Sequence, residues 1–114
     1  MSDATIDAAT FAELQESAGA DFVKELVQTF LEEAPAMLSE LRESLAAGQA
    51  DAFRRAAHSL KSNSLTFGAL ALAALARELE LGGLDAAALQ PNALGPLEAE
   101  YARVARALEA LCRG

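Results

Sequence analysis

Apolar side chains recur along the chain at spacings of three, four and seven residues, the period with which an α-helix returns to the same face. This pattern predicts helices and no alternating strand. Asp7 is suited to cap a short first helix and Asp51 to cap the helix that begins after Gly48. Gly68 is suited to end that helix in the left-handed conformation. The predicted helices cover residues 7–17, 21–47, 51–67, 72–81 and 96–111.

Proline and glycine interrupt the pattern at three places. Pro35 lies inside the second helix, where it removes one backbone hydrogen bond and crowds the preceding turn, so we expect a bend or a helix divided in two. Gly82 and Gly83 should stop the fourth helix, followed by one further turn over 85–89. The segment 91–96 then breaks the pattern, and Pro96 suits the first turn of the last helix.

Short links between amphipathic helices predict an all-α fold, an antiparallel four-helix bundle with a short additional N-terminal helix as a lid at one end. We expect residues 1–114 to form a single domain, since a chain of this length can bury a core without staples. Two apolar lines of the second helix and one of the last helix should face this core, with a docking surface as the alternative for the second of these lines. They comprise Phe22, Leu26, Phe30, Met37, Leu41 and Leu45; Val23, Val27 and Leu31; and Leu97, Tyr101, Val104, Leu108 and Leu111.

Composition narrows the classes of partner. Hydrophobic residues make up 53% of the chain, mostly alanine and leucine, and aromatic residues only 5%, which favours helices over sheets. A net charge of −8 argues against nucleic acid and anionic membranes as partners. The longest strongly apolar run, residues 69–76, is too short to cross a bilayer, so we expect a cytoplasmic protein. The single cysteine excludes an internal disulfide.

His58 is the only histidine. On a helical wheel it lies about 140° from the centre of an apolar stripe, so its imidazole should point at solvent or a partner. Residues three, four and seven positions away share its face, so we expect Lys61 to be a cation that faces solvent. The stripe comprises Phe53, Ala57, Leu60, Ser64 and Phe67, and the face of His58 comprises Arg54, Lys61, Ser62 and Leu65.

The charges around His58 predict a place for an anion. No carboxylate occurs between Ala52 and Ala76, although the chain has seventeen. We assign Glu80 to the solvated face of the next helix, with an approach to the histidine helix as the alternative. Three of the nine cationic side chains lie within four residues of His58. A neutral imidazole, with a reference pKa of about 6.5, offers an unprotonated nitrogen as nucleophile near neutral pH. An exposed nucleophile beside a cation, with no general acid, suits phosphoryl transfer.

The run His58-Ser59-Leu60-Lys61-Ser62, with Gly68-Ala69 ten and eleven positions after the histidine, resembles the phosphoacceptor motif of histidine-containing phosphotransfer (HPt) domains, His-x-Leu-Lys-Gly followed by Gly-Ala or a similar pair. The resemblance covers most of the chain, because its length, helical pattern and placement of the histidine are also similar. Ser62 replaces the usual glycine, Leu65 replaces a small residue, and the break at 91–96 departs from a region that is often helical in the family.

The resemblance implies a histidine phosphotransfer module of a multi-step two-component phosphorelay. His58 would accept a phosphoryl group through Nε2 from the aspartate of a response-regulator receiver domain and pass it to another receiver. Lys61 would offset the phosphate charge, and Ser62 would be a small neighbour able to donate a hydrogen bond. A hybrid histidine kinase is a further expected partner. No cofactor is expected on this chain, since Mg²⁺ would be held by the receiver. The expected docking residues are Phe22, Leu26, Arg54 and Leu65, where the core is the alternative place for Phe22 and Leu26.

Two alternatives remain open. The phosphoacceptor domain of a chemotaxis-type histidine kinase has a similar His-x-x-Lys run and helical bundle, but its own kinase domain phosphorylates it. A catalytically silent helical adaptor would carry His58 incidentally. Phosphotransfer from receivers separates the relay module from the adaptor.

The sequence also predicts that the chain does not phosphorylate itself. Neither Gly-x-Gly-x-x-Gly nor Gly-x-x-x-x-Gly-Lys occurs, so the usual nucleotide-binding loops are missing. With radiolabelled ATP and Mg²⁺ alone, the purified chain should acquire no label. Labelling of His58 in a kinase-free preparation would contradict both the relay module and the chemotaxis alternative, because each assigns the nucleotide chemistry to another domain.

Overall fold

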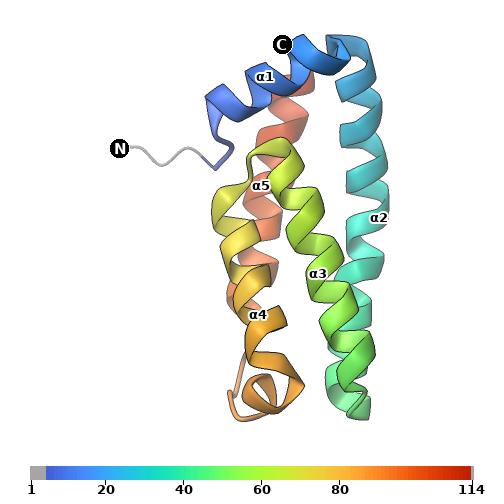
Figure 1. Ribbon diagram of the computed structural model, residues 1–114, viewed down its shortest axis with the longest axis vertical. Coiled ribbons are helices and arrows are strands. Elements are labelled where there is room, and N and C mark those ends of the chain that lie inside the picture. Colours follow the sequence, from blue (N-terminus) through green and yellow to red (C-terminus); the bar gives the residue numbers. More distant parts are fainter. Residues whose placement is uncertain (1–4, 114) are drawn as a thin grey trace.

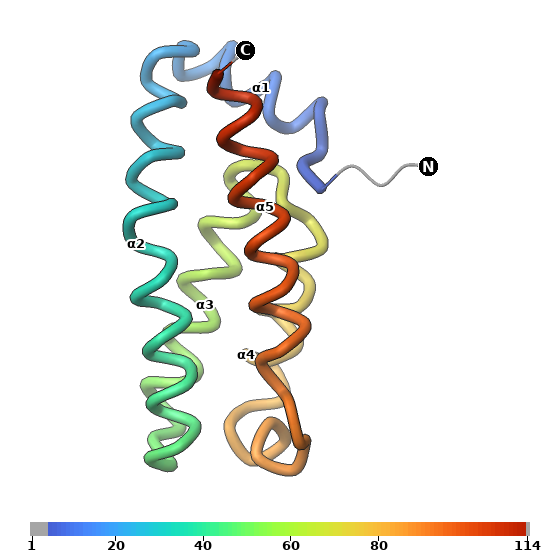
Figure 2. Tube along the Cα trace, turned by 180° about the vertical axis from the view of Figure 1, so that it is seen from behind, coloured from blue at the N-terminus to red at the C-terminus, as the bar shows by residue number. Residues whose placement is uncertain are grey.

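The computed structural model describes residues 5–113, which form five helices and contain no strand (Figure 1). Four of the helices form an elongated antiparallel bundle, and the short first helix lies across one end of it (Figures 1 and 2). This arrangement confirms the predicted all-α fold. The helices are α1 (Ala8–Ala18), α2 (Ala20–Ala47), α3 (Ala50–Phe67), α4 (Leu70–Ala88) and α5 (Gly95–Arg113).

The start of α1 is tied to the turn between α3 and α4. Asp7 caps α1 as predicted, because its Oδ2 accepts hydrogen bonds from the backbone N–H of Thr10 at 3.0 Å and from its hydroxyl at 2.6 Å. The backbone N–H of Asp7 donates to the carbonyl of Gly68 at 2.8 Å. The lid helix is therefore anchored to the loop that reverses the chain between α3 and α4.

One predicted helix cap is wrong, and one of the two outcomes expected at Pro35, a divided helix, is excluded. Asp51 is not the cap of α3, because Gln49 holds that position. Asp51 lies in the first turn, where its negative charge interacts favourably with the positive end of the helix dipole. Pro35 does not divide α2, which runs without interruption through it. Buried side chains on both sides, including Ala34 and Leu41, hold this helix, and such packing outweighs one missing backbone hydrogen bond.

The breaks predicted at Gly82 and Gly83 and at residues 91–96 are both present. Gly83 has φ 77° and ψ −180°, which interrupts helical geometry inside α4 before one further turn ends at Ala88. Pro96 lies in the first turn of α5, as its fixed φ favours. No helix among residues 5–113 combines the length and apolar character that a membrane span requires.

The core joins all four long helices. The whole predicted stripe of α3 is buried, and Phe30 of α2 contacts the rings of Phe67 on α3 and Tyr101 on α5, with centroids 5.4 and 6.0 Å away. The predicted core position of Leu111 is wrong, since its side chain is 45% exposed, and of the two positions considered for Phe22 the core one is excluded, since this side chain is 51% exposed. Both lie near helix ends, where the bundle no longer covers every apolar side chain. The buried line of α2 is instead Val23, Val27, Phe30, Ala34 and Leu41.

Glycine is required at position 68 for two reasons, its backbone conformation and the lack of space for a side chain. Its φ of 80° lies in the left-handed region, and a Cβ there would be 2.9 Å from Thr10 Cβ and 3.1 Å from the carbonyl oxygen of Asp7. Gly48, which closes α2, has a similar φ of 72°, but a Cβ at this position would meet no other atom within 4 Å. A substitution at Gly48 therefore causes backbone strain alone, whereas a substitution at Gly68 causes backbone strain and a steric conflict.

We expect Gly48→Ala to lower the free energy of unfolding by about 1–2 kcal/mol, the cost of a side chain in the left-handed region. Gly68→Ala should lower it by roughly 1–3 kcal/mol more, because α1 must also move away from the new methyl group. Urea unfolding followed by circular dichroism measures both changes. Equal losses for the two variants would contradict the close packing of α1 on this turn.

Candidate functional site

His58 lies on the face of α3 that points away from the core. Its side chain is 58% exposed, while the neighbouring Ala57 and Leu60 are buried. This orientation is the one predicted from the helical wheel. The burial of the stripe on the opposite side of α3 fixes the rotation of the helix, so the imidazole is presented to solvent by the packing of the core.

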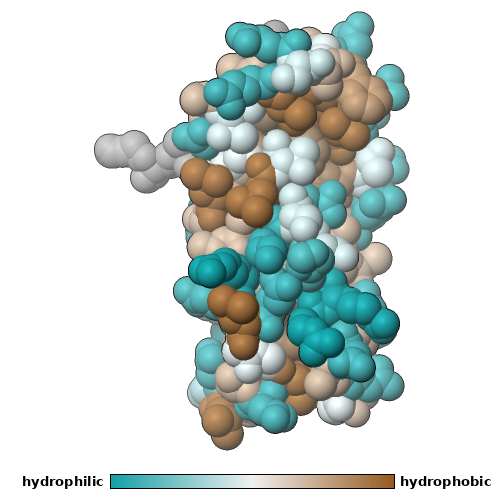
Figure 3. Space-filling view, viewed as in Figure 1, coloured by the Kyte–Doolittle hydropathy of each residue, from teal (hydrophilic) through white to brown (hydrophobic). Residues whose placement is uncertain are grey.

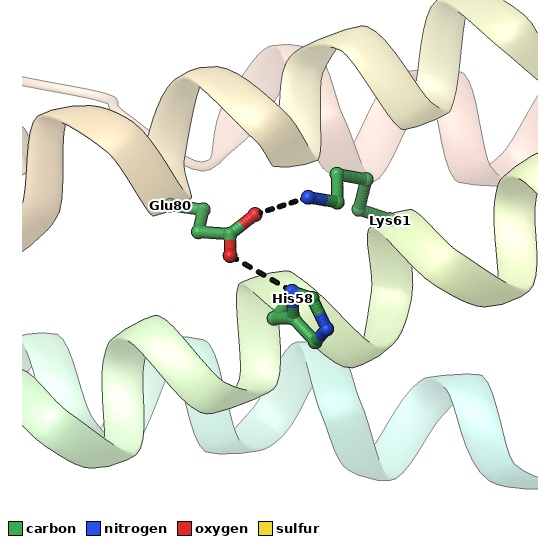
Figure 4. Close-up of polar contacts among 3 residues, drawn as sticks. All are labelled: His58, Lys61 and Glu80. Carbon is green, nitrogen blue, oxygen red and sulfur yellow. Dashed lines mark hydrogen bonds and ion pairs between the residues drawn. The ribbon is translucent and has the colours of Figure 1, made fainter.

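Glu80 of α4 contacts the side chains of both His58 and Lys61 on α3 (Figure 4). Its Oε2 lies 2.8 Å from Nδ1 of His58, and its Oε1 lies 2.7 Å from Nζ of Lys61. His58 and Lys61 are three residues apart and therefore neighbours on the helix surface. One carboxylate thus joins the two residues and links α3 to α4.

Helix pairing explains why Glu80 reaches this position. The chain reverses direction at Gly68 and Ala69, so α3 and α4 are antiparallel. Because both helices rise by the same distance per residue, positions equally far from residue 69 lie at the same height. His58 and Glu80 satisfy this condition, although they are 22 residues apart in the sequence.

The carboxylate of Glu80 is largely withdrawn from water. The side chains of Glu80 and Lys61 are only 17% and 22% exposed, and Oε1 of Glu80 is buried. The ammonium approaches Oε1 closely but off the ideal hydrogen-bond direction, so we describe the contact as an ion pair. Without this cation, the desolvation penalty of the buried carboxylate oxygen would not be compensated by any attractive interaction.

These contacts fix the proton positions of the pair. Interaction with the Lys61 ammonium, and secondly with the His58 ring, lowers the pKa of the Glu80 carboxyl below its ordinary value. Glu80 is therefore ionised near neutral pH and can only accept hydrogen bonds, so Nδ1 of His58 must donate. A neutral ring then carries its proton on Nδ1 and has a free lone pair on Nε2, which points away from Glu80 in Figure 4.

Two expectations about the charges are wrong. The face of His58 is not free of carboxylates, because Glu80 enters it from α4. Lys61 is not an unpaired cation facing solvent, since it is mostly covered and engaged by the same carboxylate. Both errors arise because the sequence window around His58 excludes the neighbouring helix.

His58, Lys61 and Glu80 form a triad of contacting side chains. The other predicted site residues lie near this triad and do not contact it through hydrogen bonds or ion pairs. Ser62 is exposed one turn after His58, and Arg54 is exposed one turn before it, where it pairs with Asp51 at 3.1 Å. Leu65 is 49% exposed and Phe22 is 51% exposed, whereas Leu26 is half-buried against the core. Within residues 5–113, no group of three or more His, Cys, Asp and Glu side chains is arranged to hold a metal ion.

The chain is similar to known proteins over most of its length. The family model of the Hpt domain matches residues 25–114. The crystal structure of histidine-containing phosphotransfer protein B (HptB) from Pseudomonas aeruginosa PAO1 is similar to the chain, with a TM-score of 0.87 and 32% sequence identity over 98% of this chain and 97% of that one. No curated protein sequence matches the chain significantly.

The lowered pKa of Glu80 predicts a specific dependence of stability on pH. A carboxyl whose pKa is lower in the folded than in the unfolded state stabilises the fold above its ordinary pKa of about 4.3, and the stabilisation is lost as the pH falls below that value. The difference in urea midpoint between the wild type and Glu80→Gln should therefore be largest near pH 7 and shrink between about pH 5 and pH 3.

Glu78→Gln is the matched control, because Glu78 is exposed on the same helix and makes no ion pair within residues 5–113. This variant should stay close to the wild type at every pH. A difference between wild type and Glu80→Gln that is constant from pH 7 to pH 3 would contradict the charge interaction described for Glu80.

Proposed function

Because the chain belongs to the Hpt family, we propose that it carries a phosphoryl group on His58 between receiver domains of a multi-step phosphorelay. The observation that best supports this role is the hydrogen bond from Nδ1 of His58 to Glu80, which leaves Nε2 as an exposed nucleophile. The donor would be the phosphorylated aspartate of one receiver, and the acceptor the aspartate of another.

The reaction transfers one phosphoryl group without a net change in protons. The Nε2 lone pair of His58 attacks phosphorus in line, a bond forms between Nε2 and phosphorus, and the bond from phosphorus to the aspartate oxygen breaks. The aspartate leaves as a carboxylate. In the second transfer a carboxylate of the next receiver attacks the same phosphorus, and the bond to Nε2 breaks.

Glu80 would assist both transfers. As Nε2 donates its lone pair, positive charge develops on the ring, and a carboxylate 2.8 Å from Nδ1 stabilises that charge. The same hydrogen bond holds the ring in the tautomer that has a free Nε2. Glu80 therefore acts through His58 as a positioning residue and need not touch the phosphoryl group.

Lys61 would supply positive charge to the phosphoryl oxygens. Its Nζ already lies one helical turn from His58, held by Glu80 at 2.7 Å, so the cation is positioned before the phosphoryl group arrives. Ser62 is exposed beside His58, where a small side chain leaves room for the phosphoryl group and can donate a hydrogen bond.

The receiver would dock over the exposed face around His58. Arg54, Leu65 and Phe22 are exposed and available for that contact, while Leu26 could contribute only the part of its side chain that the core leaves uncovered. The receiver, or a hybrid histidine kinase that contains one, would provide the Mg²⁺ for the aspartyl phosphate. Such partners would place the protein in the cytoplasm.

A phosphotransfer screen against purified, phosphorylated receivers of the same organism tests the proposal. At least one receiver should label the wild type, and the label should be lost in acid and kept in base, as expected for a phosphoramidate. His58→Gln should take no label. Acid-stable label, label on His58→Gln, or binding of receivers without any transfer would contradict the proposal, and the last result would favour the silent adaptor.

In the same assay, Glu80→Gln should slow transfer by roughly 10², the typical size of a lost acid–base or tautomer-fixing group. A glutamine amide can donate to Nδ1 and thereby favour the proton on Nε2, which removes the nucleophilic lone pair. Glu78→Gln should transfer at the wild-type rate. Equal rates for the wild type and Glu80→Gln would remove the proposed positioning role while leaving the phosphoacceptor role of His58 intact.

A further inference from the structure

A shallow groove runs between α3 and α4 toward the triad. It has a volume of about 190 Å³ and begins at the chain reversal with Leu65 and Leu70, which are 49% and 51% exposed. Lys61, the partner of Glu80, lies at its other end. The groove is therefore continuous with the site of His58. Its lining residues are Lys61, Leu65, Leu70, Ala73, Ala74 and Arg77.

The apolar part of the groove has no covering element among residues 5–113. Ala73 forms a buried floor, and the two leucines stand exposed at its rim. In the view of Figure 3, hydrophobic surface lies directly beside hydrophilic surface over α3 and α4. A shallow depression of this volume is smaller than the roughly 300–1,000 Å³ of typical small-molecule sites, so it suits a side chain of a protein partner better than a free ligand.

Arg77 adds a charge to the apolar groove. It is exposed and makes no ion pair within residues 5–113, although Glu80 lies one turn away on the same helix. Glu80 is engaged by Lys61 and His58 instead. In a protein of net charge −8, this leaves one available guanidinium at the edge of an apolar depression, an arrangement complementary to a partner that presents an apolar side chain next to a carboxylate.

We infer that the α3–α4 groove is part of the receiver-docking surface, where Leu65 and Leu70 take an apolar side chain of the receiver and Arg77 pairs with a carboxylate beside it. This inference rests on the proposed function. A receiver that brings its aspartyl phosphate to Nε2 of His58 must cover the adjacent surface, and the groove is the adjacent apolar surface on α4. The groove would then select among receivers, because a mismatched receiver would leave Arg77 unpaired or place a charge against the leucines.

The test compares transfer from a phosphorylated receiver that labels the wild type with labelling by phosphoramidate, a small donor that needs no docking. Leu70→Glu and Arg77→Glu should each raise the KM for receiver transfer about tenfold, with a maximal rate within about twofold of the wild type. Labelling by phosphoramidate should stay unchanged. For Arg77→Gln, the rate should also depend less on salt, because one screened ion pair is lost.

Leu89→Glu and Arg106→Glu are the matched controls, since Leu89 is 86% exposed at the end of α4 and Arg106 is exposed on α5. Both should resemble the wild type. If Leu70→Glu and Arg77→Glu also resemble the wild type, the groove does not dock the receiver, whereas the proposed function stands. Slower labelling by phosphoramidate would likewise overturn the inference, because the variants would then act on His58 itself.

Two further outcomes would assign the groove differently. If sedimentation shows a wild-type dimer that Leu70→Glu dissociates, the occupant is a second copy of the chain and the inference is wrong. If no receiver labels the wild type, the inference falls together with the proposed function. Failure of the proposed function is seen as absence of labelling in the wild type. Failure of the inference alone is seen in a wild type that receivers do label, so the two failures are distinguishable.

Discussion

A carboxylate withdrawn from water between two helices is the constraint on which the site depends. The buried Oε1 of Glu80 needs a cationic partner, since an uncompensated buried charge is strongly destabilising, and Oε2 contacts the exposed ring of His58. Both partners come from one turn of α3, the ammonium of Lys61 and the ring of His58. The position of the cation, the tautomer of the ring and the pairing of the two helices are therefore coupled, and a change to any one of them disturbs the others.

Small side chains make this contact possible. Where α4 faces α3 its buried positions include Ala73 and Ala76, and α3 contributes Ala57. The distance between packed helices depends on the side chains at the contact, so alanines permit a close approach. A glutamate has only two methylene groups, and it spans the gap because the helices lie near each other. The alanine-rich composition thus serves the site as well as the fold.

Features that depend on one segment alone could be predicted from the sequence. The helical period indicated the five helices, the buried stripe of α3 and the outward direction of His58. Features that depend on the detailed register and packing of one segment against another were not assigned correctly. Glu80 enters the site through the register of α4 against α3, and the continuity of α2 through Pro35 reflects packing along its length rather than local propensity. Equal spacing of His58 and Glu80 from residue 69, at the chain reversal, was the signal that could have identified the carboxylate.

The reversal of the chain at Gly68 and Ala69 has a consequence for how such domains can vary. Each helical residue turns the side-chain direction by about 100°, so one residue inserted in this turn would shift the register of α4 and rotate Glu80 away from His58. Insertions near Gly48 or in the link before Gly95 leave that register unchanged. Among related chains, length should therefore vary at those two links and stay constant here. The histidine, the lysine and the distant glutamate are best aligned as one motif across the turn.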